Sequence, residues 1–323
     1  ELIWIGGLMT MFPIFYAVIE NDLRRVLGYS MINQIGFMVV GIGLGEGMGV
    51  NGAVAHAFND VIFKGLLFMS MGAVLFRTGK INGSDLGGLY KSMPLTTGFS
   101  IVGAASISAF PLFSGFVSKS MVMQAAADQG HLVIWLMLLF ASAGVFHHAG
   151  IKIPFFAFFA HDSGIRCKEA PMNMLVAMGL SALLCVLIGC LPGPLYSLLP
   201  YAVDYQPYTS THVLLQLQLL FFSALAFIFL KLSGIYPPEL RSVNLDADWV
   251  YRRMFSATVR TVVRAVEPLK DQLLGGSRML VAWMISELHR HHNPQGIWGR
   301  TWLAGQSVLM VVIILAVFLL FYY

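Results

Sequence analysis

Long runs of apolar residues are the feature that most limits how this chain can fold. A bilayer core of about 30 Å is spanned by about 20 apolar residues in a helix. The runs that meet this test are 2–19, 27–44, 52–76, 131–160, 172–200, 212–232 and 303–323. Only 11% of the residues are charged, against roughly 25% in soluble proteins, which excludes a soluble globular enzyme. We therefore predict an all-α integral membrane protein.

The apolar segment 95–127 is too long for one straight helix across the membrane, yet it is short for two such helices. Pro111 and Gly115 stand near its middle, where proline removes a backbone donor and glycine relaxes a helix. Loop charge separates the two readings, because cytoplasmic loops collect Lys and Arg. If the segment crosses once, every basic loop lies on one side of the membrane. We predict one discontinuous helix, about eight transmembrane helices in all, and both chain ends outside the cytoplasm.

The segment 233–302 differs from the rest, because its apolar residues recur at three- and four-residue steps on one helical face. That face holds Phe255, Val259, Val262, Val266, Leu269 and Leu273, and Arg253, Arg260, Arg264 and Lys270 lie off it. The pattern predicts an amphipathic lateral helix on the cytoplasmic side, kinked at Pro268 and interrupted at Gly275–Gly276. It either braces the membrane domain or lies on the lipid surface. The predicted domains are a bundle (1–232), this lateral-helix region (233–302) and a terminal anchor (303–323).

Three ionisable residues lie inside the apolar run 52–76, where a charge costs at least about 2.5–3.5 kcal/mol. His56, Asp60 and Lys64 follow one another at four-residue steps, so they share one helix face over about 12 Å of rise. Such a ladder suits a proton relay, since each group can hold a proton and Asp60 offsets the neighbouring positive charges. The alternative is a static Asp60–Lys64 pair that only holds helices together.

Lys119 stands just after the predicted break in 95–127. Backbone groups freed by a break are tolerated only where protein or a water-filled cavity covers them. We therefore expect a partly hydrated lysine that gains and loses its proton. The alternative is that the side chain reaches out to the membrane interface.

Other polar residues of the apolar runs are further candidates for the proton path. They are Asn33, Gln34, Ser118, His147 and His148. Adjacent histidines point to different faces, so at most one of that pair lines a path. Lys152 is interpreted as reaching out to the interface. The histidines at 289, 291 and 292 do not form a metal-binding pattern.

The sequence predicts no cofactor, no metal site and no covalent chemistry, so the chain is not expected to be an enzyme by itself. It contains no Gly-rich phosphate loop, nucleophile elbow or CxxC pair. Its net charge of +4 is dispersed along the chain, which argues against a nucleic-acid partner. Because the chain opens at Glu1 inside an apolar run, we expect a piece of a longer polypeptide.

Three motifs resemble one known family of membrane subunits. They are NDLRRVLGYSMINQIGFMVVGIG (21–43), HAFNDVIFKGLLF (56–68) and FPLFSGFVSKSMV (110–122). They are similar to the proton-conducting subunits shared by respiratory complex I and the Mrp-type multisubunit Na+/H+ antiporters, and 168–201 and 236–253 look most like the D-type member of the antiporter set. That family has two inverted repeats, each with a broken helix, linked by a central chain of charged residues. The resemblance implies that Lys64 lies on this central axis and that Lys119 connects it to the outside.

The chain departs from the family pattern in three places. By the family pattern the first repeat would precede Glu1, so we expect this chain to be the C-terminal part of such a subunit and to supply only the second half-channel. Arg24 stands where lysine is common, and an arginine does not release its proton. Asp60 stands where some members have histidine or an uncharged residue.

These expectations together describe a proton-translocating subunit of a monovalent cation (Na+)/H+ antiporter in a bacterial inner membrane, beside other membrane subunits. Protons would pass along His56, Asp60, Lys64 and Lys119. Two alternatives stay open: a proton-pumping subunit of an NADH:quinone oxidoreductase or related redox complex, and a non-transporting scaffold. Exchanging Asp60 and Lys64 separates a relay from a scaffold, because a scaffold tolerates the exchange better.

Overall fold

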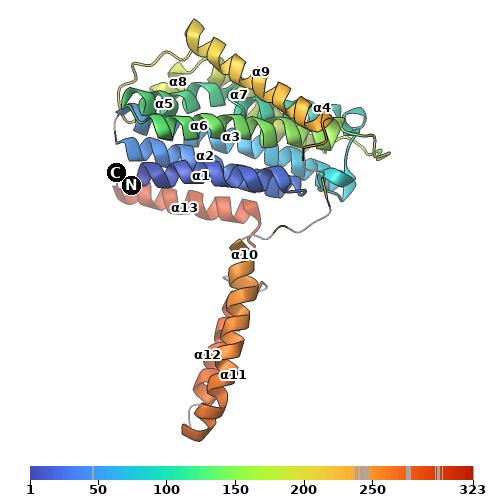
Figure 1. Cartoon of the computed structure of the whole chain (residues 1–323), viewed down its shortest axis with the longest axis vertical. Coiled ribbons are helices and arrows are strands. Elements are labelled where there is room, and N and C mark those ends of the chain that lie inside the picture. Colours follow the sequence, from blue (N-terminus) through green and yellow to red (C-terminus); the bar gives the residue numbers. More distant parts are fainter. Residues whose placement is uncertain are drawn as a thin grey trace. The chain divides into compact units, whose positions relative to one another are not determined.

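The computed structural model describes residues 1–45, 47–236, 239–240, 244, 247–273, 278–294, 296, 299 and 301–322. The chain divides into two units, residues 1–244 and residues 245–323. Each unit is helical (Figure 1), and across the described ranges the β-type pairing is an isolated bridge between Asp22 and Asn82. The prediction of an all-α membrane protein is confirmed.

Unit 1 is a bundle of helices that run along a common direction (Figure 1). Its α-helices are α1 (Leu2–Ile19), α2 (Leu23–Leu44), α3 (Gly47–Thr78), α4 (Pro94–Ile107), α5 (Ser114–Asp128), α6 (Leu132–Val145), α7 (Met172–Cys190), α8 (Gly193–Tyr196) and α9 (Ser210–Leu232). The 3-10 turns η1 (Gly83–Asp85) and η2 (Leu89–Lys91) follow α3, and the π-helical turns η3 (Phe146–Lys152) and η4 (Phe155–Phe159) continue α6.

Seven helices of the described chain are long and apolar enough to cross a membrane. Together with the broken pair α4 and α5, they agree with the predicted number, and the chain is a multi-pass membrane protein. We call the end of the bundle where α1 begins the outer end and the end where α1 stops the inner end, following the predicted orientation.

Helices α1 and α2 pack with their backbones in close approach, as small residues allow in membrane proteins. The space for a side chain at Gly36 is already filled: a Cβ there would lie 2.6 Å from Thr10 Cγ2 and 2.7 Å from Thr10 N. Gly6 is equally enclosed, with Val40 N at 2.7 Å from its would-be Cβ. Asp22 stabilises the connection between α1 and α2 at the inner end of the bundle. Its carboxylate accepts hydrogen bonds from the backbone N–H groups of Arg24 and Arg25 at the start of α2.

We expect Gly36→Ala to lower the free energy of unfolding by about 1–3 kcal/mol, because the added methyl group forces α1 and α2 apart. Gly28 on the same helix is a matched control, since nothing lies within 4 Å of its would-be Cβ. Gly28→Ala should be neutral or stabilise by about 0.5–1 kcal/mol. Thermal unfolding in detergent measures both, and equal midpoints for the two variants would contradict this packing.

The segment 95–127 is one broken helix, as predicted. Gly103 of α4 packs against Leu67, and Gly52 packs against Val122 of α5. Because Leu67 and Gly52 are about 22 Å apart along α3, α4 and α5 follow each other end to end beside that helix, and Figure 1 shows the same order. Each half is too short to cross alone.

The backbone between α4 and α5 adopts a conformation that L-residues avoid. Ala109 and Leu112 have φ values of 56° and 76° on either side of Pro111, which is strained for residues other than glycine. Gly115 plays a different part from the one predicted. It lies inside the first turn of α5, where the carbonyl oxygen of Ser106 leaves no room for a Cβ, so it permits close packing and does not loosen the helix.

The predicted span 172–200 is too long. Helix α7 ends at Cys190, because Leu191 leaves the helical region and Pro192 follows. The next residues, 191–209, return across the outer end as a short helix and an extended segment. Tyr196 anchors this segment by donating a hydrogen bond to the Val117 carbonyl in α5 (2.7 Å). Asn51 of α3 bonds both the N–H and the carbonyl of Tyr201 (3.0 and 2.9 Å).

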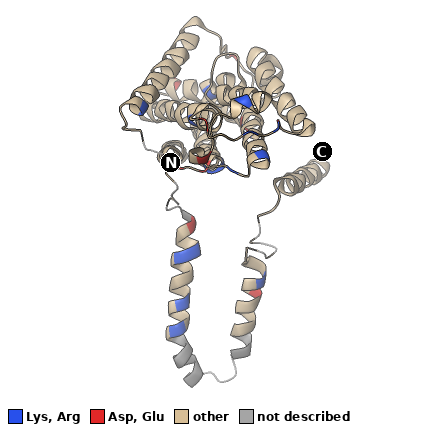
Figure 2. Ribbon diagram, turned by 90° about the vertical axis from the view of Figure 1, so that its right-hand side faces the viewer, with Lys and Arg blue, Asp and Glu red and all other residues tan. Residues whose placement is uncertain are grey.

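Unit 2 contains α10 (Ala247–Trp249), the π-helical η5 (Val250–Phe255), α11 (Ser256–Leu273), α12 (Arg278–His292) and α13 (Ala304–Tyr322). The predicted apolar stripe begins on η5 and α11 with exposed side chains of Phe255, Val259 and Val262, and basic bands follow the same helix (Figure 2). The structure does not describe the remaining side chains of the stripe and of its basic flank, which are those of Val266, Leu269, Leu273 and Lys270. The predicted break at Gly275–Gly276 also lies outside the described residues. Whether the lateral helix is a brace or a lipid anchor stays a prediction.

Candidate functional site

The three ionisable residues of α3 lie on its buried face. His56, Asp60 and Lys64 are 0%, 6% and 3% exposed. They face α2 and α5, since His56 contacts side chains on both helices and Lys64 contacts α2. The structure therefore places the ladder inside the bundle, as the four-residue spacing predicted, and its role as a relay stays a prediction.

His56 belongs to a hydrogen-bonded chain that joins the four helices α1, α2, α3 and α5. Its Nε2 lies 3.0 Å from Gln34 Oε1, and its Nδ1 lies 3.1 Å from Ser118 Oγ. Because an amide oxygen only accepts, Nε2 carries the proton and Nδ1 accepts from Ser118. Gln34 in turn donates to Asn33 Oδ1 (2.6 Å), and Asn33 donates to the Thr10 carbonyl of α1. Gln34 and Ser118, two of the further candidates, thus bond to His56 directly, and Asn33 is connected to it through Gln34.

Asp60 and Lys64 do not form a direct ion pair. Lys64 Nζ instead donates to Ser30 Oγ on α2 (2.9 Å). The salt bridges within 4.0 Å in the described part of the chain do not include Asp60, and its buried Oδ1 has no hydrogen-bond partner there. A static Asp60–Lys64 pair is therefore not what this structure contains.

Side chains from three helices bind backbone carbonyl groups on either side of the break in the helix. Asn59 of α3 donates to the Ser114 carbonyl (2.8 Å), and Gln216 of α9 donates to the Ser108 carbonyl (3.2 Å). Lys119 donates to the carbonyl of Ile107, the last residue of α4 (3.0 Å). The break is thus covered by protein, as buried polar backbone in a membrane requires.

Lys119 is inside the bundle, so the alternative that it reaches out to the interface is wrong. Its side chain is 1% exposed, and Nζ lies 5.2 Å from the centre of the Phe37 ring on α2. Both contacts stabilise the charged form, because the C-terminus of α4 carries a partial negative charge and the ring face attracts cations. In the described part of the chain the Ile107 carbonyl is the one hydrogen-bond acceptor of Lys119 Nζ, which leaves further N–H groups for a proton path.

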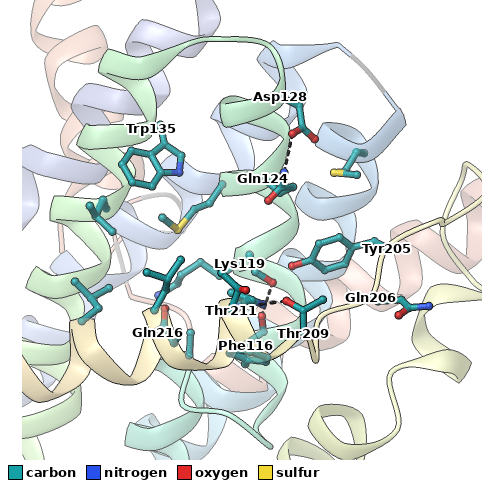
Figure 3. Close-up of a pocket in the computed structure, with 18 of the residues that line it drawn as sticks. Phe116, Lys119, Gln124, Asp128, Trp135, Tyr205, Gln206, Thr209, Thr211 and Gln216 are labelled. Carbon is teal, nitrogen blue, oxygen red and sulfur yellow. Dashed lines mark hydrogen bonds between the residues drawn. The ribbon is translucent and has the colours of Figure 1, made fainter.

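A cavity of about 590 Å³ opens beside Lys119, between α5, α6, α9 and the 191–209 segment. Figure 3 shows Lys119 and Phe116 at one part of this cavity and Asp128 at another. Asp128 and Asp204 contribute carboxylates to the lining, which raises the local concentration of cations. Tyr205 lines the same cavity, and burial raises the pKa of its phenol against an opposing hydrogen bond with Ser120. No sequence pattern indicated this cavity, because its lining comes from segments far apart in the chain.

The adjacent histidines have different surroundings, as expected of neighbours on a helix. His147 is half-buried, and its Nε2 lies 2.9 Å from the Ser223 carbonyl on α9. His148 is fully buried, and neither of its ring nitrogens has a hydrogen-bond partner in the described part of the chain. The structure thus separates one histidine bound to α9 from one that faces the interior.

Lys152 does not reach the interface, and that interpretation is wrong. Its side chain is completely buried, and Nζ donates to the carbonyls of Val18 and Glu20 (2.6 Å each) at the end of α1. It also pairs with Glu239 (3.0 Å), whose side chain is 6% exposed. Burial raises the pKa of the Glu239 carboxyl, and the charge of Lys152 opposes this. The only sequence signal for this cluster was Glu20, an acid directly after an apolar run.

The fold and these buried groups define a class: a multi-pass membrane subunit with a broken helix and an internal row of titratable side chains. Residues 1–146 match the family described as NADH:quinone oxidoreductase/Mrp antiporter, TM. This range holds the ladder, the broken helix and Lys119. The part of the chain that carries these residues thus matches the NADH:quinone oxidoreductase/Mrp antiporter family, and the resemblance seen in the motifs is confirmed.

Curated relatives resemble part of the chain. NADH-ubiquinone oxidoreductase chain 5 of Hypocrea jecorina is 30% identical over 167 residues, which is 50% of this chain and 23% of the relative. Hydrogenase-4 component B of Escherichia coli is 30% identical over 207 residues, which is 57% of this chain and 31% of the relative. The chain therefore spans about a quarter to a third of the length of these relatives.

Two solved structures share the fold. The membrane-bound sulfane sulfur reductase, an archaeal respiratory membrane complex, matches with a TM-score of 0.60 and 24% identity over 98% of this chain and 55% of that chain. The Mrp complex from Dietzia sp. matches with a TM-score of 0.55 and 21% identity over 60% of this chain and 45% of that chain. At 24% and 21% identity, these similarities show the fold alone.

Proposed function

We propose that the chain is part of a proton-translocating membrane subunit in which His56, Asp60 and Lys64 relay protons to Lys119. The observation that carries this proposal is the position of Lys119. It is a buried amine at the break of a discontinuous helix, and it lines a cavity whose other residues include two carboxylates near the outer end. A group in that position can exchange a proton with the cavity on one side and with the interior network on the other.

The contacts inside the bundle support a relay over a scaffold. Ser118, which neighbours Lys119 in the chain, bonds to His56, and Asp60 follows one helical turn later on α3. Asp60 keeps a buried oxygen without a partner in the described part of the chain, and Lys64 bonds to a neutral hydroxyl. Residues that only hold helices together are expected to be paired with each other, because an unpaired buried charge is costly.

More specifically, we propose that the chain is part of a subunit similar to the D-type member of the multisubunit Na+/H+ antiporters. This antiporter would lie in a bacterial inner membrane, with other membrane subunits as partners. A redox-driven subunit is the second candidate, favoured by the named relatives, which are an NADH-ubiquinone oxidoreductase chain and a hydrogenase component. In both cases the chain supplies the second half-channel, and the inner end faces the cytoplasm, where Arg24, Arg25 and Arg77 lie.

Lys64→Ala tests the relay, and we expect it to lower proton flux by about a hundredfold, the usual range for loss of a proton-transfer group. The assay uses membrane vesicles that hold the full-length protein with its partner subunits and a pH-sensitive dye. Arg24→Ala is the matched control, because Arg24 is exposed on the first turn of α2. Flux that survives in Lys64→Ala would refute the relay.

The same vesicles distinguish an antiporter, which is driven by an ion gradient, from a redox complex, which is driven by electron transfer. An imposed Na+ gradient should move protons if the chain belongs to an antiporter, and an electron donor should move them if it belongs to a redox complex. Proton movement with the electron donor alone would reject the antiporter assignment while keeping the relay.

A further inference from the structure

The π-helical turn η3 carries two buried basic groups that the relay described above does not use. His148 and Lys152 are four residues apart and both are 0% exposed. Turns of π-helix inside α-helices occur frequently at functional sites. The imidazole of His148 is buried and, in the described part of the chain, has no polar side chain as a hydrogen-bond partner. Such a group is unfavourable for folding alone, so its presence requires another explanation.

The position of η3 joins the interior of the bundle to its inner end. Gly150, between the two basic residues, packs directly against Ser108 at the break of the discontinuous helix. The charges of Lys64 and Lys152 both act on His148, and Ala149, the residue after His148, belongs to the same buried cluster as Phe63, the residue before Lys64. His148 therefore lies within electrostatic range of both Lys64 and Lys152.

The inner end of this row is a cluster of charged groups. Lys152 bonds to the end of α1 and pairs with Glu239. The carboxylate of Glu20 accepts the N–H groups of Asn21 and Asp22 (2.9 and 3.1 Å). Lys231 of α9 also acts on Glu239, and its Nζ lies 5.0 Å from the Phe156 ring centre. Glu20, Glu239 and Lys231 are thus the charged groups that act on Lys152 in this cluster.

We propose that Glu239, Lys152 and His148 form a second branch of the relay, which carries protons between the inner end of the bundle and Lys64. This branch rests on the proposed function, because it delivers protons to the same ladder. In each cycle the Lys152 ammonium passes a proton to one nitrogen of His148, and the other nitrogen releases one to Lys64, which has already passed its own proton along the ladder. The Glu239 carboxylate then takes a proton from water and passes it to the neutral Lys152 amine. A turn of the imidazole ring restores the starting tautomer of His148, so every group returns to its starting form and no electrons are transferred.

A matched pair of variants tests the branch in vesicles that hold the full-length protein with its partner subunits. We expect His148→Gln to lower proton flux at least about tenfold. His147→Gln should stay within about twofold, because His147 is bound to α9 and lies outside the row. Equal fluxes in the two variants would overturn the branch.

Lys119→Ala in the same preparation distinguishes the two proposals. If Lys119→Ala loses flux and His148→Gln keeps it, the branch is wrong and the relay stands. If Lys119→Ala keeps its flux, the relay is wrong and the branch falls with it.

Two further measurements separate proton transfer from a structural role. Imidazole added to His148→Ala should restore flux, because a free base can occupy the space of the missing ring, and a loss that imidazole does not restore would overturn the branch. Lys152→Arg keeps the charge and the donors but does not release a proton. We expect it to lose flux at least about tenfold while the protein stays folded, and wild-type flux in this variant would also overturn the branch.

Discussion

Replacing Lys119 by alanine is expected to abolish proton flux, with a loss of about a hundredfold or more. Lys119 is the buried amine that lines the outer cavity and bonds to the C-terminus of α4. Without it, protons arriving at His56 and Ser118 have no titratable group through which to reach the cavity. The measurement is dye-detected proton flux in vesicles that hold the full-length protein with its partner subunits.

Two control variants show whether charge, folding or proton exchange is responsible. Lys119→Arg keeps a positive charge and a donor for the Ile107 carbonyl but does not release a proton, so it should also lose flux while remaining folded. Lys91→Ala removes an exposed lysine whose partner is Asp162 (2.9 Å), and it should transport normally. Flux at the wild-type rate in Lys119→Ala would remove this lysine from the path.

The helices and the ladder could be predicted because they depend on local patterns. An apolar run of sufficient length predicts a membrane helix wherever it lies, and a four-residue spacing fixes a common helix face. Loop charge predicted the single broken crossing at 95–127. The one overlong span, 172–200, shows the limit of this reasoning: Pro192 ends α7, while the residues after it are apolar enough to look like more of the same helix.

The cavity and the cluster at Lys152 could not be predicted, because each is made by residues distant in the sequence. Lys152 meets backbone carbonyls of α1 more than a hundred residues before it, and Glu239 comes from the stretch after α9. Backbone carbonyls carry no sequence signal, since every residue has one. A lysine near the end of an apolar run therefore looks like an interfacial residue until the fold shows what surrounds it.

Replacing Lys152 by methionine is expected to have the largest effect on stability, lowering the free energy of unfolding by about 3–5 kcal/mol. The substitution removes the partner of Glu239 and leaves the carbonyls of Val18 and Glu20 without their donor. Burial already raises the pKa of Glu239, and the opposing charge would be lost. Thermal or denaturant unfolding in detergent measures the change.

A second substitution identifies the cause of that loss. In Lys152→Met with Glu239→Leu, no unpaired carboxylate remains, so the double variant should recover much of the stability, as replaced buried ion pairs commonly do. A double variant as unstable as Lys152→Met would show that the carbonyls at the end of α1, and not Glu239, determine the stability of this cluster. Because the recovered variant lacks both groups, its proton flux also reports whether the inner end needs them for transport as well as for folding.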